Sequence, residues 1–106
     1  MTKAIFYRSG RLLSGASIAG HTGFAPEGED ILCAAISSVA YFTANTITEV
    51  MKVPAEVSVA EGEGAEFRLF VPERELIRCQ DILKGLRLHL EGLSEQYPGQ
   101  IIITEV

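Results

Sequence analysis

The spacing of apolar positions along the chain alternates between short extended runs and two long helical stretches. Residues 3–8 and 12–19 form two short apolar runs separated by Ser9 and Gly10, a pair typical of a turn. Residues 57–60 and 65–71 alternate apolar and polar side chains on either side of a Glu-Gly-Glu-Gly segment. The sequence therefore predicts two β-hairpins.

The first helical stretch, residues 31–48, contains no charged residue. Its apolar residues are spread around the helix, which predicts burial on most sides; they include Leu32, Ile36, Val39, Phe42 and Ile47. A membrane span would fit the length, but the serines, threonines and asparagine of this stretch make it too polar. We therefore expect a central core helix and no membrane contact.

The second helical stretch follows Pro72, whose neighbours Glu73 and Glu75 favour a helix start. Apolar residues then recur at steps of three and four, which predicts one buried stripe; they are Leu76, Cys79, Leu83, Leu86, Leu90 and Leu93. A Tyr-Pro-Gly segment ends the helix. Residues 100–106 carry three consecutive isoleucines and predict a final strand, inside a sheet rather than at an open edge.

These elements predict an α+β fold of ββαββαβ order, with a five-stranded mixed sheet and two helices. At 106 residues we expect a single domain, residues 1–106. The composition, 47% apolar and 22% charged, is that of an ordinary globular protein.

Charge and cysteine content narrow the function. The net charge of −5 and the lack of a Lys/Arg cluster argue against direct nucleic-acid binding. The N-terminal segment lacks the pattern of a secretory signal, and two cysteines are too few for a disulfide framework. We therefore expect a cytosolic protein with both thiols reduced.

The candidate chemistry lies in one segment, GHTGFAPEGEDILCAAIS, which spans residues 20–37. Its glycines and proline predict a loop up to Glu29, and Asp30 is a good helix N-cap. Cys33 would then lie in the first turn, where unpartnered N–H groups and the helix dipole stabilise a thiolate. The N–H groups of Leu32 and Cys33 would be available to an oxyanion. A thiolate at such a place is a nucleophile.

Each candidate residue also has a structural reading. Cys33 by default is a small core side chain, but its position favours the nucleophile. His21 either satisfies a loop backbone group or acts as the base of Cys33, and the pattern does not decide between them. Asp30 is better explained as a cap than as the group that orients His21, although one carboxylate serves both. Cys79 is expected in the core and His89 on the surface.

No standard metal site is predicted, because one His, one Cys and one Asp at these spacings do not form a zinc set. No cofactor is required for thiol chemistry of this kind. A redox function ranks last, since no resolving cysteine lies near Cys33 in the sequence.

The same segment resembles the ribosomal-processing cysteine protease (Prp) family of bacteria, whose members share a pattern like GHAxYxxxGxDIVCAxxS. The matching positions are His21, Gly28, Asp30, Ile31, Cys33, Ala34 and Ser37. The chain departs from the pattern at Thr22, Phe24 and Leu32, none of which is a catalytic position. The length and the order of elements are also similar to the family.

The resemblance implies a cysteine endopeptidase that removes the N-terminal extension of a large-subunit ribosomal protein. It implies Cys33 as nucleophile, His21 as base and Asp30 as the motif aspartate. It also implies a homodimer and a loop that moves to admit substrate. We place this gating loop at Thr22, Gly23, Phe24 and Gly28. The alternative is a noncatalytic domain that binds a ribosomal or assembly partner.

Overall fold

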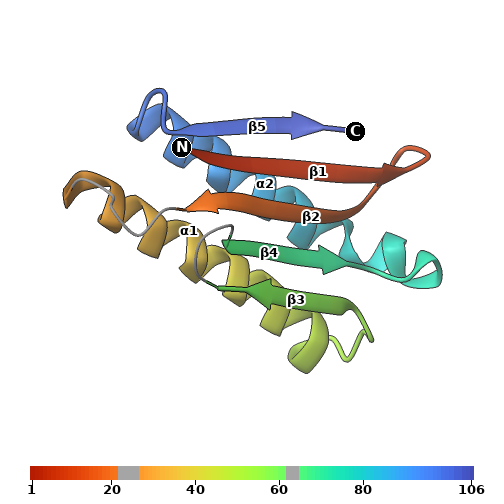
Figure 1. Cartoon of the computed structure of the whole chain (residues 1–106). Helices are drawn as coiled ribbons and strands as arrows, with labels where there is room; N and C mark the ends of the chain where they lie inside the picture. The colour runs from red at the N-terminus through yellow and green to blue at the C-terminus, as the bar shows by residue number, and fades with distance from the viewer. Residues whose placement is uncertain (22–26, 62–64) are drawn as a thin grey trace.

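The computed structural model describes residues 1–21, 27–61 and 65–106, of which the side chains of residues 21 and 27–30 are not described. The elements follow the predicted ββαββαβ order (Figure 1). They are β1 (Thr2–Ser9), β2 (Leu12–His21), α1 (Glu27–Asn45), the π-helical turn η1 (Thr46–Val50), β3 (Glu56–Ala60), β4 (Ala65–Phe70), the 3-10 turn η2 (Glu73–Glu75), α2 (Leu76–Gln96) and β5 (Ile101–Glu105).

The strands form one sheet in the order β3-β4-β2-β1-β5. Both predicted hairpins are present as the antiparallel pairs β1 with β2 and β3 with β4, whereas β5 runs parallel to β1. The fold class is therefore confirmed as α+β with a five-stranded mixed sheet. Strand β2 lies in the middle of this sheet, between β1 and β4.

Strand β5 lies at an edge of the sheet, so the expectation that it would be internal is wrong. One buried face is enough for its isoleucines: Ile101 is buried, Ile103 partly buried, and Ile102 is 42% exposed. Glu105 links this edge strand to β1 and α2, because its carboxylate accepts hydrogen bonds from Arg8 at 2.9 Å and from Arg87 at 2.7 Å. The bond from Arg8 is the main reason that the pKa of Glu105 is lowered.

Both helices lie on the same face of the sheet, side by side (Figure 1). The stripe predicted for α2 is confirmed, since all six of its apolar positions are buried. Helix α1 is buried along one side only, contrary to the expectation of burial on most sides. Ile31 and Phe42 are each 63% exposed. The buried side consists of Leu32, Ile36, Ala40, Thr43 and Ala44, and Ile47 of η1 continues it.

Within the described residues, one helical stretch, Ile31–Val50, is long and apolar enough to cross a membrane by length and composition, with 33% of it buried in the structure. A helix that packs on a sheet passes the same test. Its threonine hydroxyls are paired locally: the Oγ1 atoms of Thr43, Thr46 and Thr48 donate to carbonyl oxygens four residues earlier, at 2.8, 2.7 and 3.0 Å.

Gln80 joins α2 to the central strand. The β1–β2 register shifts after Tyr7, so β2 carries an extra residue next to Leu13. The N–H of Leu13 donates to Oε1 of Gln80 at 2.9 Å, and Nε2 of Gln80 donates back to the carbonyl oxygen of Leu13 at 2.8 Å. The same Nε2 also donates to the carbonyl oxygen of Leu76 at 2.8 Å. This buried amide therefore satisfies backbone groups that the irregular register leaves without a strand partner.

We expect Gln80→Met to lower the free energy of unfolding by about 2 kcal/mol, because methionine fills the space but leaves buried backbone groups of Leu13 unpaired. The same substitution at the exposed Lys84 of α2 is the matched control and should change stability by less than about 0.5 kcal/mol. Urea denaturation of both variants measures the difference. Equal stability of Gln80→Met and the parent would show that the bond pair contributes nothing.

Candidate active site

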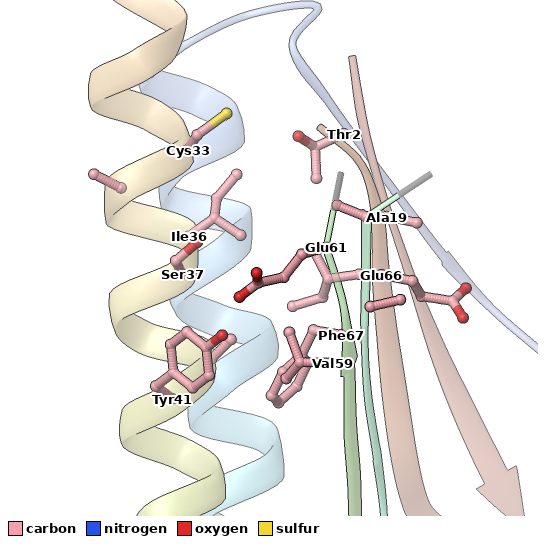
Figure 2. A pocket seen from close by; sticks show the side chains of 15 residues that line it. Thr2, Ala19, Cys33, Ile36, Ser37, Tyr41, Val59, Glu61, Glu66 and Phe67 are labelled. Carbon is pink, nitrogen blue, oxygen red and sulfur yellow. The ribbon is translucent and has the colours of Figure 1, made fainter. Parts of the chain in front are cut away.

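A groove of about 330 Å³ lies between α1 and the end of the sheet that carries strands β2, β3 and β4. Its helix wall includes Cys33, Ser37 and Tyr41, which follow one another at four-residue steps along one side of α1 (Figure 2). We call this space the groove. The thiol of Cys33 thus lies at the wall of a depression that is open to solvent.

The sheet side of the groove is mostly apolar. Ile18, Val59 and Phe67 come from three neighbouring strands and line it together. The rings of Tyr41 and Phe67 meet edge to face, with centroids 6.0 Å apart and an interplanar angle of 80°. This ring pair connects the helix wall with the sheet side of the groove. It lies about two helical turns from Cys33 along α1, one turn past Ser37.

Cys33 is half-buried and lines the groove, so its side chain reaches the space where a ligand would lie. The buried Leu32 precedes it in the sequence, and a helix turns by about 100° per residue. Burial of Leu32 against the sheet therefore sets Cys33 at the border between core and groove.

The helix start differs from the expectation. Helix α1 begins at Glu27, so Asp30 lies within its first turn rather than at the N-cap, and Cys33 lies in the second turn. Residues 27–29 are helical and not part of a loop. The acidic residues Glu27, Glu29 and Asp30 explain the early start, because negative charge in a first turn is favourable.

This earlier start removes part of the predicted activation of Cys33. Only the first four N–H groups of a helix lack an intrahelical acceptor, and the effect of the dipole falls off within the first turn. The N–H groups of Leu32 and Cys33 come later than those four. They are therefore bonded within α1, and the expectation that they would bind an oxyanion is wrong.

His21 is the last residue of β2, where its backbone is in register with Ala65 of β4. Ala65 and Ala19 both line the groove together with Cys33. The backbone of His21 therefore reaches the same end of the sheet as the groove. The His21 side chain lies outside the described residues, so its predicted contact with Cys33 stays a prediction.

Gly20 determines the backbone path just before His21. Its φ of 102° is in the region that favours glycine, and a Cβ atom built there would lie 2.4 Å from the carbonyl oxygen of Met1. No larger residue fits this path without a shift of the backbone. The glycine before the motif histidine thus has a steric reason.

Asp30 precedes Cys33 by three residues, so the two positions are about one helical turn apart along α1. Gly28 lies in the first turn of α1. The remaining gating-loop residues, Thr22, Gly23 and Phe24, lie outside the described residues. The roles of all these residues stay predictions.

Cys79 is fully buried on α2, as expected. Burial raises the pKa of its thiol, because the apolar surroundings disfavour the thiolate, while the charge of Arg78 opposes this effect. At neutral pH Cys79 is therefore a neutral core side chain. His89 is exposed, also as expected. Among the described residues, no cluster of three His, Cys, Asp or Glu side chains forms a possible metal site.

Sequence analysis did not identify the groove residues outside the motif. Tyr41 and Phe67 come from α1 and β4, and only the packing of the helix on the sheet brings them together. Glu61 also lines the groove, although in the sequence it is simply part of a turn between two strands. The alternation that predicted β3 and β4 placed Val59 and Phe67 on the helix side, but it did not indicate a groove.

Solved structures share this fold over the whole chain. SMU.848 from Streptococcus mutans has 20% sequence identity and a TM-score of 0.88, covering 100% of this chain and 97% of that one. The ribosomal processing protease Prp from S. aureus, in complex with a substrate peptide, has 18% identity and a TM-score of 0.80. The same protease with a covalently linked product peptide has 19% identity and a TM-score of 0.82. Both comparisons cover 100% of each chain.

Among curated proteins, no match to this chain was found. The family model of the cysteine protease Prp, however, matches residues 1–102, which include the whole segment of residues 20–37 and both cysteines. Together with a groove that presents Cys33, this match shows that the chain belongs to the Prp family of cysteine proteases.

Proposed function

We propose that this cysteine protease removes the N-terminal extension of a large-subunit ribosomal protein, with Cys33 as its nucleophile. The observation that carries the proposal is the place of Cys33 on the wall of a groove of about 330 Å³ that is open to solvent. A ribosomal processing protease of the same fold is known with a substrate peptide bound. The reaction takes place within one domain, residues 1–106, and in the cytosol, where thiols stay reduced.

The mechanism needs a base, because Cys33 lies beyond the first turn of α1 and gains little from the helix dipole. His21 takes the thiol proton, and the thiolate attacks the carbonyl carbon of the scissile peptide bond. The imidazolium returns the proton to the leaving amine, and an acyl-enzyme remains on Sγ. Water, deprotonated by His21, then hydrolyses this thioester and releases the second product.

The groove supports binding of an extended peptide. Its apolar sheet side, with Ile18, Val59 and Phe67, provides a surface for apolar substrate side chains. Val59 is 44% exposed in the structure, and a bound peptide would remove that apolar surface from water.

The enzyme acts as a homodimer in this proposal, as the family resemblance implies. Ile31 and Phe42 support this, since each is 63% exposed and the two lie three turns apart on the same side of α1. Apolar side chains exposed on one side of a helix form a surface that is suited to burial against a second copy of the chain.

The alternative is a noncatalytic domain that binds a ribosomal or assembly partner through the same groove. The two readings differ in chemistry, because only the protease needs a reactive thiol. Peptide-bond cleavage and thiol reactivity therefore distinguish them.

Cys33→Ala should abolish cleavage of a tagged, extended ribosomal protein, whereas Cys79→Ala should retain it, because only Cys33 reaches the groove. His21→Ala should lower turnover by about 100-fold or more, the usual contribution of a general base. Mass spectrometry of the products measures cleavage, and thermal melting checks that Cys33→Ala stays folded. Cleavage by Cys33→Ala at the parent rate would refute the assignment of the nucleophile.

Asp30→Asn separates an electrostatic role from a structural one. Asparagine keeps the size of the side chain but cannot stabilise an imidazolium by charge, so turnover should fall while stability changes by less than about 1 kcal/mol. Turnover and thermal melting are measured on the same preparation. If turnover is unchanged, Asp30 contributes only to the helix start and the site is a Cys33–His21 dyad.

The thiol of Cys33 should react with iodoacetamide at pH 6 much faster than that of Cys79. Burial raises the pKa of Cys79, which keeps its thiol protonated, and also blocks access. Peptide mapping after brief labelling reports both sites, and labelling in urea should remove the difference. Equal labelling of the folded protein would favour the noncatalytic reading.

A further inference from the structure

The groove carries charge of only one sign among its described residues. Two side chains that line it are carboxylates, Glu61 and Glu66, and no described lining residue is basic. Both come from the β3–β4 hairpin, on the side of the groove that faces α1. The rest of this side is apolar apart from Thr2.

The two carboxylates differ in direction and pairing. The side chain of Glu61 extends toward α1 at the level of Ser37, whereas that of Glu66 extends to the opposite side of the sheet (Figure 2). Oε1 of Glu66 lies 3.7 Å from Nη1 of Arg68, its neighbour on the same face of β4. In the described part of the chain, no ion pair includes Glu61. Glu61 thus places an exposed negative charge across the groove without a partner from the described residues.

The position of Glu61 along the axis of α1 determines which substrate residue it would contact. Ser37 lies one turn along α1 from Cys33, an axial distance of about 6 Å. An extended peptide advances by about 3.3 Å per residue. A peptide that runs along α1 with its scissile carbonyl at Cys33 therefore brings a residue about two positions from the cut next to Glu61.

We propose that Glu61 is a specificity-determining residue that selects a substrate with a lysine or arginine two or three positions from the scissile bond. The inference rests on the proposed function, since it assumes that the groove holds the substrate peptide. A basic side chain pairs with the carboxylate, while an acidic one meets like charge.

The size of the expected effect follows from exposure. An ion pair that stays in contact with water contributes up to about a fivefold difference in affinity. The pair also weakens with salt, because the Debye length falls from about 10 Å at 0.1 M to about 3 Å at 1 M. A modest, salt-sensitive preference is thus the signature of this contact.

The test uses peptides that span the cut in the extended ribosomal protein, with lysine, norleucine or glutamate at each of three positions on either side. Norleucine matches the length of lysine without its charge. Values of kcat/KM are measured for the parent, Glu61→Gln, Glu61→Lys and Glu66→Gln at low and high salt. Binding of the same peptides to Cys33→Ala, with and without Glu61→Gln, is measured by fluorescence anisotropy.

At one position the parent should prefer lysine over norleucine by about three- to fivefold at low salt, and less at high salt. Glu61→Gln should reduce this ratio to about one, and Glu61→Lys should prefer glutamate, whereas Glu66→Gln should keep the parent ratio. An unchanged ratio in Glu61→Gln, an equal loss in Glu66→Gln, or no lysine preference at any position would overturn the proposal.

The outcomes also separate this inference from the proposed function. Cleavage without any charge preference refutes the role of Glu61 and leaves the protease reaction intact. A lysine preference in binding that Glu61→Gln removes, without cleavage of any peptide by the parent, supports Glu61 and refutes the proposed substrate.

Discussion

The one-sided burial of α1 is the constraint on which the site depends. Leu32, Ile36 and Ala40 pack toward the sheet and fix the rotation of the helix about its axis. Since each residue turns the helix by about 100°, a rotation by one position would move Cys33 into the core or onto the outer surface. The small Ala40 and Ala44 also let the helix approach the sheet closely. Core packing thus decides where Cys33, the proposed nucleophile, lies.

The second requirement is the path of β2, which brings His21 to the same end of the sheet. Gln80 of α2 is hydrogen-bonded to Leu13 of this strand, next to the shift in its register. Gly20, just before His21, allows the backbone to lie close to the carbonyl oxygen of Met1. In the proposed mechanism His21 at the end of this strand, rather than the start of α1, activates the thiol of Cys33, because the effect of the helix dipole falls off within the first turn. A buried amide and a glycine with a positive φ therefore set the path of the strand that ends at His21, the base of the proposed mechanism.

Local sequence patterns predicted most of the helices and strands and indicated the motif, but they did not predict how much of each element is buried by the others. Alternation gave both hairpins, and the leucine stripe gave α2, because those signals depend on neighbours in the sequence. The edge position of β5 and the exposure of Phe42 depend on which faces the other elements cover. The start of α1 was misplaced because Asp30 is as suitable for the first turn as for the cap. The motif indicated Cys33, whereas Glu61 became visible only when the hairpin was placed opposite α1.

The edge strand β3 connects substrate binding with solubility. Val57 and Val59 are 40% and 44% exposed on the helix side of an edge strand, an arrangement that favours pairing with other chains. Glu56 is the first residue of this strand and Glu61 follows its last residue, and like charges at these positions oppose pairing with another copy. Glu61 then serves two purposes that do not conflict: its charge repels a second acidic copy of the strand and attracts a basic substrate. The charge that would select a basic substrate thus also lowers the tendency of the exposed valines of β3 to pair with another copy of the strand.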